Sequence, residues 1–294
     1  TNQWSRCFSI YDTNCDGVAN SSGNGSYSQR LTVAESQMTG QGMPGPTYKF
    51  ESWYLAREDI NIYNSMATKR VVPTWSGSVW SLGGNDQYAL GPAIDRWVDP
   101  TNPPANAKSA EIANSEGHTK VAVKATDLGG GNWRYDYAVM NLDFARALID
   151  PAHVTQPNLH YFHNFGYDKF RVLIAPNVTV SNLVFSDGDT DPNNDWTGAV
   201  DGGPITWTAP VNPSPIANVP PVLNPLNWGT LYKFSFVANA APIAITTSLH
   251  IAEAGDPVSY EAVVLGPSSD EVLASGFDGA VPTSALPVPL DWSK

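Results

Sequence analysis

The sequence has few charged residues and no apolar run long enough to cross a membrane. Only 15% of its 294 residues are charged, where an ordinary soluble domain has about 25%. A membrane helix needs about 20 consecutive apolar residues, so the sequence predicts no membrane span. It also has no Gly-x-Ser-x-Gly elbow, His-Glu-x-x-His helix, P-loop or dinucleotide-binding glycine pattern, so no enzymatic reaction is favoured.

Basic residues are also scarce. The 16 Lys and Arg residues are outnumbered by 28 Asp and Glu residues, which gives a net charge of −12. Because nucleic-acid binding needs clustered basic side chains, the composition argues against a nucleic-acid partner. An acidic surface is compatible with divalent cations or simply with solubility.

Cysteine is nearly absent. Cys7 and Cys15 are the two cysteines, and a close pair of this kind predicts a local disulfide and an oxidising compartment. Two free thiols are the alternative. We therefore expect a secreted protein, extracellular or at the cell surface, with Thr1 as its mature terminus after signal removal.

Glycine, proline and aromatic residues are abundant: 24 Gly, 24 Pro, 10 Trp, 12 Tyr and 10 Phe. This composition favours short strands joined by ordered turns. After the turn Gly129–Gly131, the residues Trp133, Tyr135, Tyr137 and Val139 occupy every second position, and 228–236 alternates in a similar way. Such period-2 patterns predict two strands at the centre of a β-sandwich with an aromatic core, with Trp133 and Trp228 among its members.

The predicted fold class is all-β, with two β-sandwich (Ig- or jelly-roll-like) units, long ordered loops and at most one or two short helices. The best helix candidate is Ala56–Lys69. The predicted organisation has four parts: a disulfide-bearing segment 1–26, a first β unit 27–115, a second β-sandwich 116–267 and a tail 268–294. The boundary is placed near 115 because Gly83–Gly117 is a loop-rich stretch with four prolines.

Two acidic loops are candidate calcium sites. Asp12, Asn14 and Asp16 alternate and precede Gly17, as in a calcium loop, but the acid expected at position 12 of that loop is replaced by Gly23. The second loop carries the four carboxylates Asp187, Asp189, Asp191 and Asp195. An Asx-turn loop stapled by Cys7–Cys15 and an ordinary acidic β-turn loop are the respective alternatives. Calcium is the expected cofactor.

Other candidate sites carry weaker signals. His153, His160 and His163 with Asp168 could bind zinc or copper, although scattered histidines in an aromatic loop are more often packing or surface residues. Glycosidase carboxylates lie far apart in sequence, and the candidates are Glu51, Glu58, Asp59 and Asp136. Trp75 and Trp80 are candidates for stacking on a glycan, although aromatic residues of a sandwich are more often core.

Two long motifs resemble a family of uncharacterised secreted β-rich proteins from environmental bacteria. They are Asn132-Trp-Arg-Tyr-Asp-Tyr-Ala-Val-Met-Asn-Leu and Leu226-Asn-Trp-Gly-Thr-Leu-Tyr-Lys-Phe-Ser-Phe, with Asp195-Trp-Thr between them. The resemblance covers roughly Tyr48 to Pro267. It implies a secreted compartment and a β fold, and no catalytic residues.

The sequence therefore predicts a non-enzymatic extracellular structural protein, a subunit of a fibre, sheath or matrix. Its expected partner is a second copy of itself, joined by strand exchange of a terminal segment, Thr1–Ile10 or Val281–Lys294, and stiffened by calcium. The alternative is a carbohydrate-binding module or glycan-active enzyme, with cell-surface polysaccharide as the partner.

Overall fold

The computed structural model describes residues 35–38, 47–54, 59–84, 86–155, 161–189, 191–200, 202–211 and 222–267. These residues are mainly β-strands, which confirms the all-β prediction. Within these ranges, no helix has the length and apolar character required to cross a membrane.

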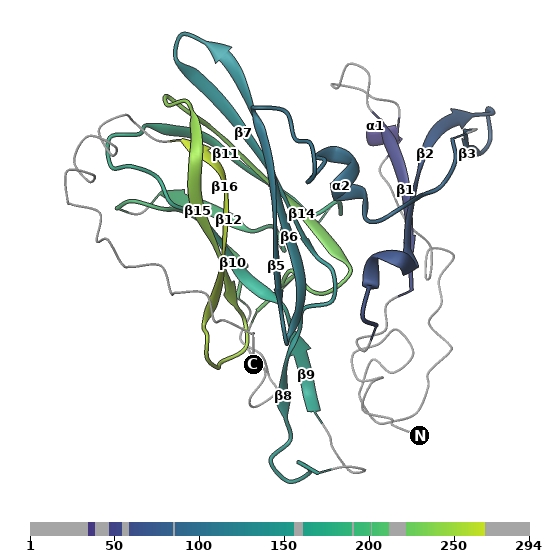
Figure 1. Cartoon of the computed structure of the whole chain (residues 1–294), viewed down its shortest axis with the longest axis vertical. Coiled ribbons are helices and arrows are strands. Elements are labelled where there is room, and N and C mark those ends of the chain that lie inside the picture. The colour runs from purple at the N-terminus through teal and green to yellow at the C-terminus, as the bar shows by residue number, and fades with distance from the viewer. Residues whose placement is uncertain are drawn as a thin grey trace, which may run out of the picture.

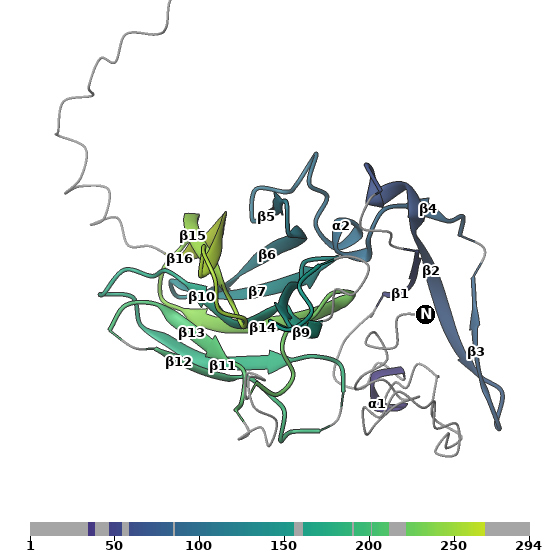
Figure 2. The ribbon, with the colours of Figure 1, turned by 90° about the horizontal axis from the view of Figure 1, so that it is seen from below.

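Two five-stranded antiparallel sheets form a sandwich (Figures 1 and 2). The first, here called the β7 sheet, has the order β11-β14-β7-β6-β5. Its strands are β5 (Ala107–Asn114), β6 (Gly117–Gly129), β7 (Asn132–Asn141), β11 (Val180–Ser186) and β14 (Thr230–Ala238). The second, the β10 sheet, has the order β12-β13-β10-β15-β16. Its strands are β10 (Tyr167–Val172), β12 (Thr197–Val200), β13 (Ile205–Thr208), β15 (Pro242–Ile251) and β16 (Ser259–Pro267).

The space between the sheets is filled by aromatic side chains. Tyr135 and Tyr137 of β7 face Phe236 of β14 in stacked pairs, with ring centroids 5.1 and 5.9 Å apart. From the opposite sheet, Phe170 reaches to 4.8 Å from Phe234. The two tyrosine hydroxyls donate hydrogen bonds to backbone carbonyls, Tyr135 to Ala240 and Tyr137 to Leu265, each at 2.7 Å. The predicted aromatic core around β7 and β14 is thus confirmed.

A third, four-stranded sheet precedes the sandwich in the chain. It contains β1 (Tyr48–Trp53), β2 (Met66–Trp75), β3 (Trp80–Gly83) and β4 (Ala89–Leu90). Three short helices accompany the strands: α1 (Glu35–Met38), the 3-10 helix η2 (Ile62–Ser65) and α2 (Ala93–Trp97). Apolar residues of this unit, among them Ile62, Met66 and Ile94, pack in one cluster with Ala122 and Ala138 on the outer face of the β7 sheet.

Two hairpins extend from this body. β2 and β3 project away from the sandwich in both views (Figures 1 and 2). β8 (Arg146–Ile149) and β9 (Tyr161–Phe165) form a separate two-stranded sheet.

The structure corrects the expected helix Ala56–Lys69. Residues 62–65 form η2, and β2 begins at Met66 and pairs with β1 from Trp53↔Met66 to Tyr48↔Val71. The β-branched residues of β2 favour a strand, and its pairing with β1 satisfies the backbone as a ladder.

The stretch expected to be a loop before residue 115 contains β5, which pairs with β6 from Ala107↔Lys124 to Asn114↔Gly117. The first strand of the sandwich therefore comes from residues that the sequence analysis assigns to the first unit. Trp228 was expected in the core, and this prediction was wrong. It lies in the turn before β14 and is 55% exposed.

Candidate functional site

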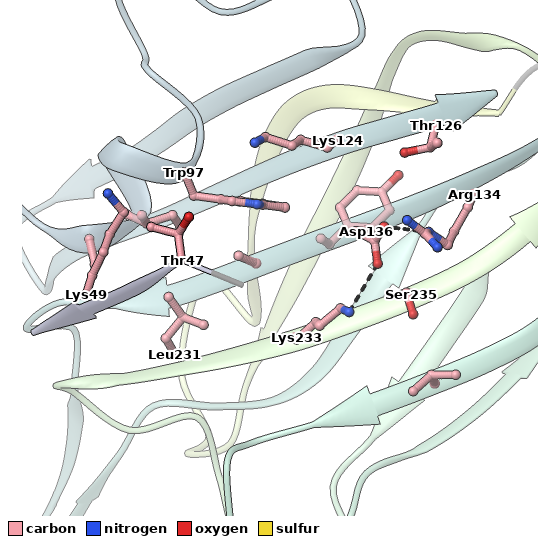
Figure 3. A pocket seen from close by; sticks show the side chains of 15 residues that line it. Thr47, Lys49, Trp97, Lys124, Thr126, Arg134, Asp136, Leu231, Lys233 and Ser235 are labelled. Carbon is pink, nitrogen blue, oxygen red and sulfur yellow. Dashed lines mark hydrogen bonds and ion pairs between the residues drawn. The ribbon is translucent and has the colours of Figure 1, made fainter. Parts of the chain in front are cut away.

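One hollow in the described part of the chain is a groove on the outer face of the β7 sheet, here called the sheet groove (Figure 3). It has a volume of about 1020 Å³. Strands β6, β7, β14 and β11 form its floor, and α2 and the start of β1 form one wall. Its lining residues are Thr47, Lys49, Ala93, Ile94, Trp97, Lys124, Thr126, Arg134, Asp136, Tyr137, Ala138, Val184, Leu231, Lys233 and Ser235.

Strand alternation places the polar side chains of the floor in a row. Lys124 of β6 pairs with Asp136 of β7, Asp136 pairs with Ser235 of β14, and Ser235 pairs with Val184 of β11. Because successive side chains of a strand point to opposite faces, the aromatic residues beside them enter the core while this row faces outward. The same alternation that builds the core therefore builds the groove.

The groove is positively charged, in contrast to the chain as a whole. Its lining has four basic side chains and a single carboxylate, Asp136. Asp136 is bound on both sides, by Arg134 Nε at 2.8 Å and by Lys233 Nζ at 3.2 Å (Figure 3). Lys49 and Lys124 have no ion pair within the part of the chain that the structure describes.

Lys124 lies against an aromatic ring instead of a carboxylate. Its Nζ is 5.1 Å from the centroid of Trp97, within the range of a cation–π contact. Burial lowers the pKa of Lys124, since desolvation disfavours the charged ammonium. The groove thus presents a cation whose charge is only partly compensated by the protein.

The wall of the groove is fixed to the floor by a neighbouring ion pair. Lys120, four residues before Lys124 on the same face of β6, binds both carboxylate oxygens of Asp95 in α2, at 2.6 and 2.8 Å. Its Nζ also lies 4.5 Å from the centroid of the Tyr63 ring. In β1, Glu51 accepts a hydrogen bond from the Ala93 N–H at 3.0 Å, and burial raises the pKa of this carboxyl. These contacts hold α2, and with it Trp97, at a defined place beside the sheet.

The second predicted calcium loop lies between β11 and β12. Asp187, Asp189 and Asp191 each accept a hydrogen bond from the backbone N–H two residues later, at 3.1, 2.7 and 3.0 Å. The pKa of Asp195 is raised by burial and then by the three other carboxylates. The four carboxylates therefore belong to one loop and repel one another.

Side-chain amides partly compensate the negative charge of this loop. Asn194 Nδ2 donates to Asp189 at 2.8 Å, and Asn224 Nδ2 donates to Asp187 at 2.5 Å. Nowhere in the described ranges do three or more His, Cys, Asp or Glu side chains form a group that could hold a metal ion. The first loop, with Asp12, Asn14 and Asp16, lies outside the described residues, as do Cys7 and Cys15, so the disulfide stays a prediction.

Trp75 and Trp80 lie at the end of the projecting β2–β3 hairpin. They are cross-strand partners, with ring centroids 5.5 Å apart and planes tilted by 44°. Trp75 is 47% exposed, and Val79 and Leu82 beside it are exposed as well. The pair is accessible, but its two rings do not form one flat platform.

The remaining candidates are dispersed or have other partners. His153 Nδ1 lies 2.7 Å from Asp150, and Asp168 pairs with His250, which the sequence analysis did not include, at 2.6 Å. His160 lies outside the described residues. Among the glycosidase candidates, Asp136 is held by two basic side chains and Glu51 by the α2 backbone, while Glu58 lies outside the described residues.

The sequence analysis did not identify the sheet groove. Its signal was nevertheless present, because Lys124, Asp136 and Lys233 occupy the polar positions of the strongly alternating strands. The sequence does not show that these strands pair with one another, and it is this pairing that brings the three side chains onto one face.

Comparison with known proteins gives no match: no protein-family model, no curated protein and no solved structure is similar to the chain. The resemblance to secreted bacterial β-rich proteins therefore stays a prediction.

Proposed function

We propose that this chain is a secreted, extracellular structural protein that assembles with copies of itself by strand exchange, as a subunit of a fibre, sheath or matrix. The observation that supports this proposal best is the edge strand β16. An acceptor edge for an added strand is what such assembly requires.

β16 is a long and weakly protected edge. It extends over nine residues, and within the described ranges its ladder pairs only with β15. Glu261 is its one charged residue, and Val263 is 49% exposed. Natural proteins usually shorten such edges or place charges on them, because unpaired backbone groups attract another strand. The other edge of the same sheet, β12, follows that rule with only four residues.

The donor strand in this proposal is one of the two terminal segments, Thr1–Ile10 or Val281–Lys294, both outside the described residues. A head-to-tail contact between a donor segment and β16 of the next copy leads to rings or open fibres. The aromatic core makes each subunit a rigid unit for such an assembly.

The acceptor edge can be tested with matched valine variants. Val263→Lys places a charge on β16, and we expect it to weaken self-association at least tenfold. Val200→Lys is the control, because Val200 is 47% exposed on the opposite edge β12. Sedimentation velocity and negative-stain electron microscopy of the full chain measure the outcome. Deletion of each terminal segment in turn identifies the donor. A native protein that stays monomeric, or a Val263→Lys variant that assembles normally, contradicts the proposal.

We also propose that calcium stiffens the subunit at the loop Asp187–Asp195. Calcium binds carboxylate and amide oxygens, and Asn194 Oδ1 in this loop is buried without a hydrogen-bond partner among the described residues. Burial and then repulsion by the neighbouring carboxylates raise the pKa of Asp195, and a cation would relieve that repulsion.

Calcium removal is expected to lower the melting temperature. A ligand present at 100 times its Kd stabilises the folded state by about 2.7 kcal/mol, so chelation by EDTA should remove a stabilisation of that order. Asp189→Asn should reduce the EDTA effect if the second loop is responsible, and Asp16→Asn is the corresponding variant of the first loop. A thermal melt that is unchanged by EDTA removes calcium from the proposal.

Carbohydrate binding is the second candidate function. The exposure of Trp75 on a projecting hairpin favours it, because an accessible indole can stack on a sugar ring.

A further inference from the structure

We infer that the sheet groove binds an anionic polysaccharide, a chain of sugar rings that carry carboxylate or sulfate groups. This inference is independent of self-assembly, since it uses the outer face of the β7 sheet and not the β16 edge.

The charge of the groove selects an anion. The chain carries −12 overall, yet four of its basic side chains gather in this one groove around a single carboxylate. Asp136 is already bound by Arg134 and Lys233. Lys49 and Lys124 therefore remain for a ligand.

The centre of the groove floor excludes binding by strand addition. β6, β7 and β14 are interior strands, hydrogen-bonded on both sides within the β7 sheet. Their backbone groups are occupied, so a ligand meets side chains only. An extended peptide gains most of its affinity from backbone hydrogen bonds at a free edge, and the strands that carry Lys124, Asp136 and Ser235 offer none.

The side chains of the groove match the chemistry of an acidic sugar chain. Trp97 offers an aromatic ring, and Leu231 and Val184 offer apolar contact for the ring carbons. The hydroxyls of Thr47, Thr126 and Ser235 can exchange hydrogen bonds with sugar hydroxyls. Lys49 and Lys124 can pair with the acidic groups.

The size of the groove also favours a chain over a small ion. Pockets for small molecules have volumes of about 300–1000 Å³, and the sheet groove, at about 1020 Å³, is at the upper limit of that range. A free phosphate or acetate would leave most of it empty.

The test is binding of the full chain to polygalacturonate, which carries carboxylates, and to dextran sulfate, with neutral dextran as the uncharged probe. We expect the native protein to bind at least one of the two acidic polymers, more weakly as salt increases, and to ignore neutral dextran. Which acidic polymer binds better identifies the acid group.

Matched lysine variants locate the site. The double variant Lys49→Gln and Lys124→Gln should lose at least tenfold in affinity. Lys169→Gln is the control, since Lys169 alternates with the core residue Phe170 and so faces outward on the opposite sheet; it should change affinity less than twofold. Trp75→Ala, on the projecting hairpin, should leave this binding unchanged. Circular dichroism and thermal melting check that each variant is folded.

Three results would overturn the inference. The first is that the native protein binds neither acidic polymer. The second is that the double variant and Lys169→Gln lose affinity equally. The third is that Trp75→Ala alone abolishes binding. A double variant that loses self-association, with no polysaccharide binding by the native protein, would also overturn it and would assign the groove to an acidic segment of a second copy.

Discussion

Replacing Phe234 with alanine is expected to lower the free energy of unfolding by about 4 kcal/mol. Phe234 is fully buried on β14. Its ring centroid lies 4.8 Å from Phe170, 5.3 Å from Trp207 and 5.6 Å from Trp196. Phe170 and Trp207 lie on β10 and β13 of the opposite sheet, and Trp196 lies just before β12. Fixed in this way, the three rings cannot all move into the space left by the deletion.

The matched control is Trp228→Ala. This substitution removes a larger side chain than Phe234→Ala does. However, Trp228 is 55% exposed and makes no ring contact with the described aromatic residues. We expect it to cost less than about 1 kcal/mol. Urea denaturation followed by tryptophan fluorescence and circular dichroism measures both variants. Equal losses would show that the centre of the core is not where the structure places it.

Asn141→Leu is expected to destabilise the protein by at least about 3 kcal/mol, although it makes the interior more apolar. Asn141 is fully buried at the end of β7. Its Nδ2 donates to the carbonyls of Phe144 and Leu226 at 3.0 and 2.9 Å, and its Oδ1 accepts from the Phe144 N–H at 2.9 Å. Leucine leaves the Phe144 N–H and carbonyl buried without a partner among the described residues, and each costs about 1–3 kcal/mol. The Leu226 carbonyl keeps the Tyr167 N–H, at 3.2 Å.

Asn239→Ala tests whether burial is the cause. Asn239 also accepts a hydrogen bond from a backbone N–H, that of Thr179 at 2.7 Å, but it is exposed to solvent. Water replaces the lost partner there, so we expect a loss below about 1 kcal/mol. If Asn141→Leu lowers the free energy of unfolding as little as Asn239→Ala does, the side-chain amide of Asn141 does not hold the junction of β7, β10 and β14.

The strands at the centre of the sandwich were predictable because their signal is local. Tyr135, Tyr137 and Val139 alternate with Asp136 and Ala138, and each of the three is fully buried. A strand that buries one face of a sheet must show this period, so the sequence analysis located β7 and β14 and their inward faces.

Other elements were not predictable because tertiary pairing overrides a weak local pattern. Residues 66–69 lie in the expected helix, but β1 pairs with them. Ala107–Asn114 looks like a polar loop, yet its alternation suffices for an edge strand next to β6. Trp228 continues an apparent alternation, but the turn with Gly229 at φ +75° breaks the period before β14 begins.

The sequence by itself determined the fold class, the aromatic character of the core and the acidic, weakly charged surface, because these depend on composition and on periodicity within single strands. Only the tertiary structure decided the sheet groove and the open edge β16. Lys124 and Lys233 are far apart in the chain and meet because β14 pairs with β7 and β7 with β6. Strand order is a property of long-range pairing, and no local pattern of residues records which strand will be a neighbour and which will be left at an edge.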